Sequence, residues 1–78
     1  MVIPMTYSER IRALREDSDY TQQDMADILY INRRTYSAYE NGINAVPLDI
    51  LCALADFHRV SVDYLLERTD EKKPYPAK

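Results

Sequence analysis

The sequence contains little of what several common protein classes require. Its 78 residues include one glycine, one cysteine, one histidine and no tryptophan. A single glycine cannot build a glycine-rich phosphate loop, which excludes the usual nucleotide-binding motifs. A single cysteine cannot form an internal disulfide, and no apolar run approaches the roughly 20 residues that span a bilayer. No signal-peptide pattern is evident either, so we expect a cytoplasmic protein without a membrane segment.

Catalytic and metal-binding chemistry also lack the residues that they need. The only cysteine, Cys52, and the only histidine, His58, are six residues apart, which places them on different faces of a helix. Packed or half-exposed helix residues are the simpler interpretation. A structural zinc ion would need four nitrogen or sulfur ligands at short spacings. The sequence therefore predicts no enzyme, no metal and no cofactor.

Size and charge narrow the remaining classes. A chain of this length forms one domain, and its 46% hydrophobic and 29% charged residues are typical of a folded protein. Its net charge of −3 argues against a nucleic-acid partner, because phosphate binders normally present a basic surface. Only a local basic patch would restore that possibility.

Glycine and proline are rare between residues 6 and 66, which predicts an all-α fold. Apolar spacing divides this stretch into five helices, near 6–17, 22–29, 33–40 and 47–59, with a short last helix that follows Ser61 and reaches Leu66. The predicted ends rest on capping residues: Thr21 with Asp24, Asn32, Asn41-Gly42, Pro47 and Ser61. We divide the chain into a folded domain, 1–68, and a charged, proline-containing tail, 69–78, which we expect to be frayed.

Only three residues, 30–32, separate the second and third predicted helices. A helix, a tight turn and a second helix form the geometry that presents the second helix to the major groove of DNA. The third helix begins with Arg33 and Arg34, and arginine suits bidentate contact with guanine. Residues 32–39 contain these two arginines and no acid, so a local basic patch exists. A solvated helix start explains the arginines equally well, and the pattern alone leaves both interpretations open.

A series of motifs covers nearly the whole ordered chain: 10–15 (RIRALR), 21–26 (TQQDMA), 35–42 (TYSAYENG), 47–51 (PLDIL) and 60–66 (VSVDYLL). This series resembles the Cro/C1-type (XRE-like) helix-turn-helix domain of phage repressors and bacterial transcriptional regulators. The resemblance implies a five-helix, lambda-repressor-like fold whose second and third helices read double-stranded DNA. It further implies a repressor that binds an inverted-repeat operator as a homodimer. The alternative is a protein-interaction module or antitoxin-like partner, which the negative net charge favours.

The resemblance also implies roles for individual residues. The base-contacting positions are Arg33, Arg34, Ser37 and Ala38, and the phosphate-contacting positions are Thr21, Gln22, Thr35 and Asn41. Gln22 would also brace the third helix, and Arg15 and Glu40 match a structural pair that ties the first helix to the end of the third. Ala38 departs from the family, because its methyl group can contact only a thymine methyl and leaves most of the direct readout to the two arginines.

Other departures and the seven tyrosines need separate interpretation. Family members often carry glycine where this chain has Asp19, Tyr30 and Arg59, and left-handed backbone at these positions would cost each residue about 1 kcal/mol. The resemblance places Tyr36 and Tyr64 in the core. Tyr39 is expected either in the core or beside the DNA backbone, and Tyr20 is expected to form a hydrophobic staple.

Overall fold

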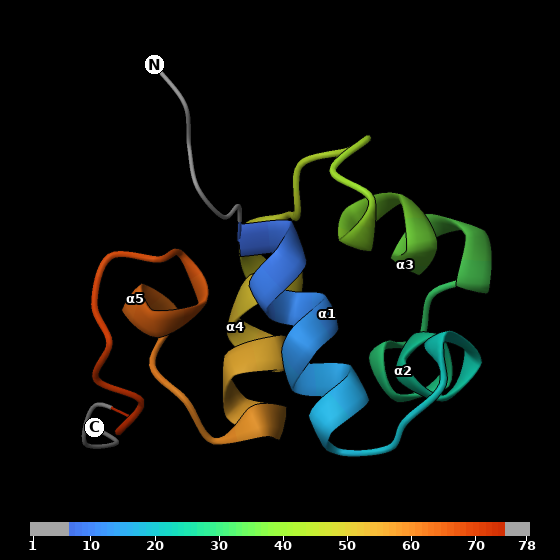
Figure 1. Ribbon diagram of the computed structural model, residues 1–78. Coiled ribbons are helices and arrows are strands. Elements are labelled where there is room, and N and C mark those ends of the chain that lie inside the picture. The colour runs from blue at the N-terminus through green and yellow to red at the C-terminus, as the bar shows by residue number, and fades with distance from the viewer. Residues whose placement is uncertain (1–6, 75–78) are drawn as a thin grey trace.

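The computed structural model describes residues 7–74, and these residues form five helices and no strand (Figure 1). The helices are α1 (Tyr7–Asp17), α2 (Gln22–Leu29), α3 (Arg33–Glu40), α4 (Leu48–His58) and α5 (Val62–Leu65). The all-α, five-helix prediction is confirmed. Pro47 is the N-cap of α4 rather than its first residue, and the predicted start of α1 at residue 6 lies outside the described residues.

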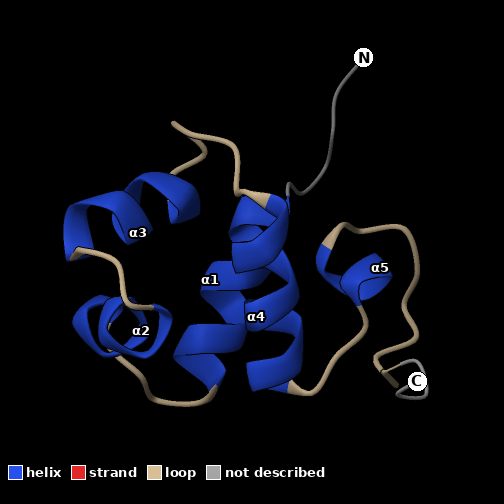
Figure 2. Ribbon diagram, turned by 180° about the vertical axis from the view of Figure 1, so that it is seen from behind, coloured by secondary structure: helices blue, strands red, loops and turns tan. Residues whose placement is uncertain are grey.

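α1 occupies the centre of the molecule. It contacts α3 on one side and α5 on the other, while α2 packs on α3 and α4 packs on α5 (Figures 1 and 2). The helix pair α2 and α3 therefore forms one flank of the molecule, and α5 lies on the opposite flank. The largest fully buried side chains come from all five helices: Ile11, Met25, Tyr36, Leu54 and Leu65.

The tyrosines divide between the core and the surface. Tyr36 is fully buried and Tyr39 is 7% exposed, so both belong to the core. Tyr64 is half-buried, with the Arg10 guanidinium 4.1 Å from its ring centroid. The Tyr20 ring packs edge-on against Phe57 of α4, with centroids 5.2 Å apart, and its proposed staple contact stays a prediction.

Helix ends follow the predicted capping chemistry. Asp24 N–H donates to Thr21 Oγ1 over 3.0 Å and Thr21 N–H donates to Asp24 Oδ2 over 2.9 Å, which is a complete capping box. Ser61 Oγ accepts from Tyr64 N–H over 3.0 Å at the start of α5. These bonds satisfy backbone donors that have no partner within their helices.

Left-handed backbone occurs at the three non-glycine positions where the sequence suggested it. The φ angles are 63° at Asp19, 59° at Tyr30 and 57° at Arg59. Glu67, with a φ of 65°, is a fourth such residue that the sequence did not indicate. Side chains other than glycine cost roughly 1–2 kcal/mol in this conformation, so these turns are strained.

Part of the predicted tail, within residues 69–74, contacts the start of α5. Ser61 N–H donates to the Lys72 carbonyl over 2.9 Å, and Ser61 Oγ donates to the Glu71 carbonyl over 3.2 Å. The Lys72 ammonium lies 5.7 Å from the Tyr64 ring centroid. The segment is held because it satisfies polar groups at the start of α5 that would otherwise lack partners. The domain boundary at residue 68 and the fraying of the tail stay predictions.

Candidate nucleic-acid interface

The turn between α2 and α3 is fixed by hydrogen bonds at both of its ends. Tyr30, in left-handed conformation, donates its N–H to the Asp27 carbonyl, and Ile31 N–H donates to the Ala26 carbonyl over 3.0 Å. Asn32 then caps α3, because its Oδ1 accepts from Thr35 N–H over 2.7 Å. These two caps, one closing α2 and one opening α3, set the direction in which α3 leaves α2.

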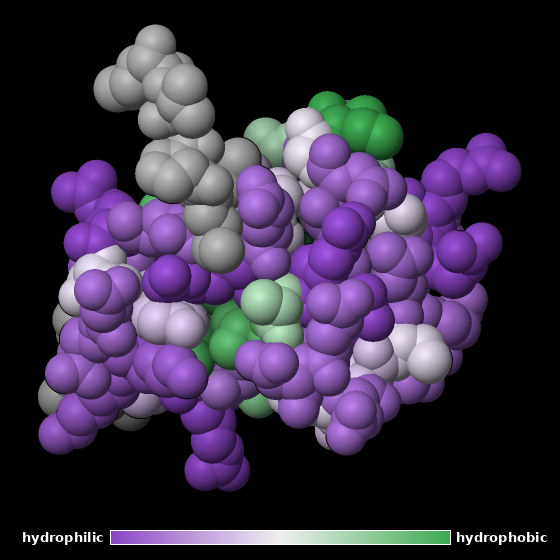
Figure 3. All heavy atoms as spheres, in the orientation of Figure 1, coloured by the Kyte–Doolittle hydropathy of each residue, from purple (hydrophilic) through white to green (hydrophobic). Residues whose placement is uncertain are grey.

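α3 has a buried face and an exposed face. Tyr36, Tyr39 and Glu40 are buried against the rest of the molecule. The residues predicted to contact bases lie on the other side, where Arg33 and Arg34 are exposed and Ser37 and Ala38 are partly exposed. The surface over α2 and α3 is predominantly hydrophilic in Figure 3. The structure therefore brings the predicted base-contacting residues to one accessible helix.

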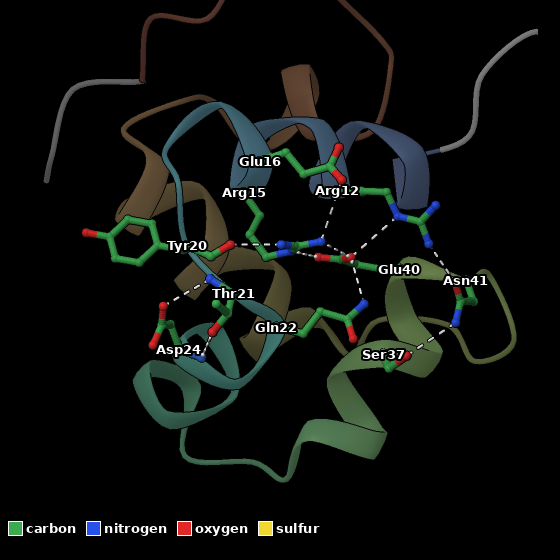
Figure 4. A network of polar contacts seen from close by, with 10 residues as sticks. All are labelled: Arg12, Arg15, Glu16, Tyr20, Thr21, Gln22, Asp24, Ser37, Glu40 and Asn41. Carbon is green, nitrogen blue, oxygen red and sulfur yellow. Dashed lines mark hydrogen bonds and ion pairs between the residues drawn. The ribbon is translucent and has the colours of Figure 1, made fainter.

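The C-terminal end of α3 is anchored to α1 by a bidentate ion pair between Arg15 and Glu40 (Figure 4). Arg15 Nε donates to Glu40 Oε2 over 2.7 Å, and Arg15 Nη2 donates to Oε1 over 3.1 Å. The Glu40 side chain has no exposed surface and that of Arg15 is 12% exposed. Arg15 also donates to the Tyr20 carbonyl over 2.8 Å. This pair fixes the position of α3 relative to the centre of the molecule.

The buried carboxylate of Glu40 is held in its charged form. Burial alone would raise the pKa of Glu40, but the hydrogen bonds from Arg15 and Gln22 and the Arg15 charge outweigh burial and lower it. The hydrogen bonds between Arg15 and Glu40 raise the pKa of Arg15. The Tyr36 hydroxyl is buried without a well-formed hydrogen bond, and burial together with the nearby Glu40 charge raises the pKa of Tyr36. The ion pair is therefore stable at neutral pH.

Gln22, predicted to contact phosphate and brace α3, donates its side-chain N–H to Glu40 Oε1 over 3.1 Å. This bond joins the first residue of α2 to the last residue of α3. The backbone N–H groups of the first two residues of α2 have no partner within the helix, and a helix N-terminus with free N–H groups favours anions. A shallow pocket of about 540 Å³ opens here, and its lining contains two arginines and two acids: Arg15, Arg33, Glu16 and Asp19.

Arg12 is a residue of this region that the sequence reasoning missed. Its Nη2 donates to Asn41 Oδ1 over 2.6 Å, and its Nε lies 3.5 Å from Glu40 Oε1. Asn41 in turn donates its side-chain N–H to Ser37 Oγ over 3.3 Å. The signal that could have found Arg12 is its spacing of three residues from Arg15, which puts both side chains on one face of α1.

Cys52 and His58, which the sequence separates on α4, do not form a site together. Cys52 is exposed, whereas His58 is half-buried, with an Nε2 that has no hydrogen-bond partner. Burial lowers the pKa of His58. Within residues 7–74, no three histidine, cysteine or acidic side chains are grouped as metal ligands would be, and no helix has the length and apolarity to cross a membrane.

A family model described as helix-turn-helix matches residues 11–65, which include α2, α3 and most of the other helices. The curated relatives of this chain include two transcriptional regulators from Bacillus subtilis. The uncharacterized HTH-type transcriptional regulator YobD is 38% identical over 68 residues, covering 87% of this chain and 61% of that protein. The SPbeta prophage-derived regulator YonR is 40% identical over 63 residues, covering 81% and 58%. The chain thus spans about three fifths of the length of these relatives.

A similar solved structure is that of the P22 c2 repressor protein in complex with a synthetic operator. The two structures superpose with a TM-score of 0.76 and 26% sequence identity, over 83% of this chain and 98% of the repressor chain. The arrangement of five helices is therefore the one seen in a phage repressor that has been crystallised on operator DNA.

Proposed function

We propose that this chain, which belongs to the Cro/C1-type helix-turn-helix family, binds operator DNA in a sequence-specific manner and regulates transcription, as a repressor that occupies its operator. The family is not a class of enzymes. The observation that carries the proposal is the exposed start of α3, where Arg33 and Arg34 project from a helix whose other end is anchored to α1 through Glu40. A fixed helix with exposed arginines at its N-terminal end suits the major groove.

In this proposal, the residues divide into two groups by what they recognise. Arg33 and Arg34 contact base edges, because arginine donates two parallel hydrogen bonds to guanine, and Ser37 and Ala38 lie on the same side of α3. The phosphate contacts come from Thr21, Gln22, Thr35 and Asn41. Phosphate contacts set the position of a protein on the duplex, whereas base contacts provide its sequence preference.

The negative net charge of the chain is compatible with DNA binding because the charges are unevenly distributed. α3 contains two arginines and a single acid, Glu40. That acid has no exposed surface and is paired with Arg15, so it adds little negative potential at the helix surface. The exposed surface of α3 is therefore basic although the chain as a whole is acidic.

We propose a homodimer on an inverted repeat, in the cytoplasm. One helix reads only a few base pairs, and two half-sites about 34 Å apart place two recognition helices on the same side of the duplex. A protein-interaction role for the same helices is the second candidate, and the net charge of −3 favours it.

Selection of bound duplexes from a randomised pool tests the proposal. We expect enrichment of a motif with dyad symmetry, and a footprint that protects one continuous patch containing both half-sites. Binding should weaken steeply as salt increases, because each neutralised phosphate releases counterions. Enrichment of no motif at any salt concentration would favour the protein-interaction role, and protection of a single half-site by one protein per duplex would contradict the dimer.

A further inference from the structure

Arg12 presents a partly exposed positive charge whose contact with an acid is long. Glu40 is the one acid with which Arg12 forms an ion pair within residues 7–74, and Arg15 already binds both oxygens of that carboxylate. The Arg12 contact is the longest of the set, at 3.5 Å, against 2.7 Å for the nearest Arg15 contact. Arg15 also lies 4.0 Å from the Glu16 carboxylate, so Arg15 is the better neutralised of the two arginines, and the partly exposed Arg12 guanidinium presents its charge at the junction of α1 and α3.

The Arg12 charge lies at a position where a bound phosphate would otherwise be repelled. The C-terminal end of a helix has a partial negative charge from its unpaired carbonyl groups, and Asn41 directly follows the end of α3. A phosphate contact by Asn41 therefore needs a cation beside it. The Arg12 side chain is 42% exposed and is bonded directly to the Asn41 side chain, as Figure 4 shows.

Arg12 also fixes which way the Asn41 amide faces. Its guanidinium has donors only, so the amide oxygen of Asn41 must face Arg12. The amide nitrogen then faces Ser37, where one of its two hydrogens is used by Ser37 Oγ and the second is free. The Ser37 hydroxyl accepts that bond and can still donate its own hydrogen. Arg12, Asn41 and Ser37 thus form a chain of bonded side chains that present donors.

We propose that Arg12 is a DNA-contacting residue: it supplies the charge of one phosphate-binding site at the end of α3, and it orients Asn41 to donate to that same phosphate. The proposal rests on the proposed function, because it needs DNA bound along α3. It changes the assignment of Ser37, whose hydroxyl belongs with this phosphate rather than with a base edge. It also makes the contact of Asn41 with phosphate dependent on a residue of α1.

Two substitutions of Arg12 and one matched control separate its charge from its packing. Arg12→Gln removes the charge and keeps an amide donor, whereas Arg12→Lys keeps the charge. Arg68→Gln removes the same charge from an exposed residue whose backbone N–H donates to the Asp63 carbonyl of α5, and α5 lies on the flank opposite α3 (Figure 1). Affinities are measured as a function of salt on the operator obtained by selection, and thermal unfolding of each variant shows that it is folded.

For Arg12→Gln, we expect about tenfold weaker binding at each half-site, which is the value of one hydrogen bond to a charged group. The slope of log affinity against log salt should become shallower by about 0.9 for each half-site. Arg12→Lys should retain the wild-type slope. Arg68→Gln should bind as the wild type does.

Operators with a neutral methylphosphonate at single positions identify the phosphate itself. One position in each half-site should weaken the wild type and Arg12→Lys but not Arg12→Gln. Asn41→Ala keeps the Arg12 charge and should show a smaller effect than the wild type at that same position. If Arg12→Gln keeps the wild-type salt slope and the wild-type sensitivity to every methylphosphonate, the inference is wrong although DNA binding stands. If the wild type itself selects no operator, the proposed function fails and this inference fails with it.

Discussion

Removal of Arg15 should destabilise the domain more than the removal of any exposed arginine. In Arg15→Ala, Glu40 Oε2 loses its Arg15 donor, while Oε1 keeps Gln22 at 3.1 Å and Arg12 at 3.5 Å. The carboxylate has no exposed surface, so water cannot replace the lost partner without movement of the structure. Breaking a buried ion pair from one side costs about 3–5 kcal/mol, and the remaining donors place the loss near the lower value.

The reverse substitution, Glu40→Ala, should cost less, about 2 kcal/mol, because the Arg15 guanidinium is partly exposed and keeps its bond to the Tyr20 carbonyl. The double variant should lose about 3 kcal/mol, which is less than the sum of the single losses, since neither partner is left unpaired. A domain of this size is stable by about 4–12 kcal/mol, so Arg15→Ala removes a large fraction of the total.

Urea and thermal unfolding, followed by circular dichroism, measure these differences. Each kcal/mol corresponds to about 4–8 °C in Tm for a domain of this size. Arg34→Ala is the matched control, because it removes an exposed arginine from α3 and should change stability by less than about 0.5 kcal/mol. Single losses that add up in the double variant would show that the ion pair does not contribute as the structure indicates.

Three further predictions follow from strain, protonation and the bracing of α3. Tyr30→Gly should be about 1 kcal/mol more stable than Tyr30→Ala, because both remove the 95% exposed ring but only glycine relieves the strain of the left-handed backbone. Equal melting temperatures of the two variants would exclude strain at this turn. Burial lowers the pKa of His58 in the folded protein below its ordinary 6.5, so the unfolded chain binds the proton more readily. The contribution of neutral His58 to the free energy of unfolding is complete above pH 6.5, and it should be lost as the pH falls through the lowered pKa. Urea titrations from pH 7 to 5 should show this decrease in the wild type and not in His58→Leu. Gln22→Ala should weaken binding to every operator variant by the same factor, and a changed ranking of variants would place Gln22 at a base instead.

The sequence predicted the helices well because their ends are encoded by local chemistry. The side chains of Thr21, Asn32 and Ser61 each accept a hydrogen bond from the backbone N–H three positions along the chain, so their roles are visible in a short segment. The left-handed positions required the family resemblance, because nothing in the local sequence identifies Tyr30 or Arg59 as a substitute for glycine.

The sequence did not reveal contacts in which backbone groups join distant segments of the chain. Residues 69–74 are held by backbone carbonyls bonded to Ser61, and no side-chain pattern announces such a bond. Arg12 was missed for a different reason. Its partner Asn41 is 29 residues away, and the bond between them depends on the angle at which α1 crosses the end of α3.

The central claim is that Arg33 and Arg34 read bases, and the ranking of operator variants tests it most directly. Affinities of the wild type, Arg33→Ala and Arg34→Ala are measured against a panel of single-base variants of the selected operator, at several salt concentrations so that general phosphate attraction can be subtracted. Each substitution should cost about 1–3 kcal/mol on the preferred operator and relax the preference at one or two positions in each half-site. If both variants keep the wild-type ranking and lose only overall affinity, the two arginines do not read the sequence.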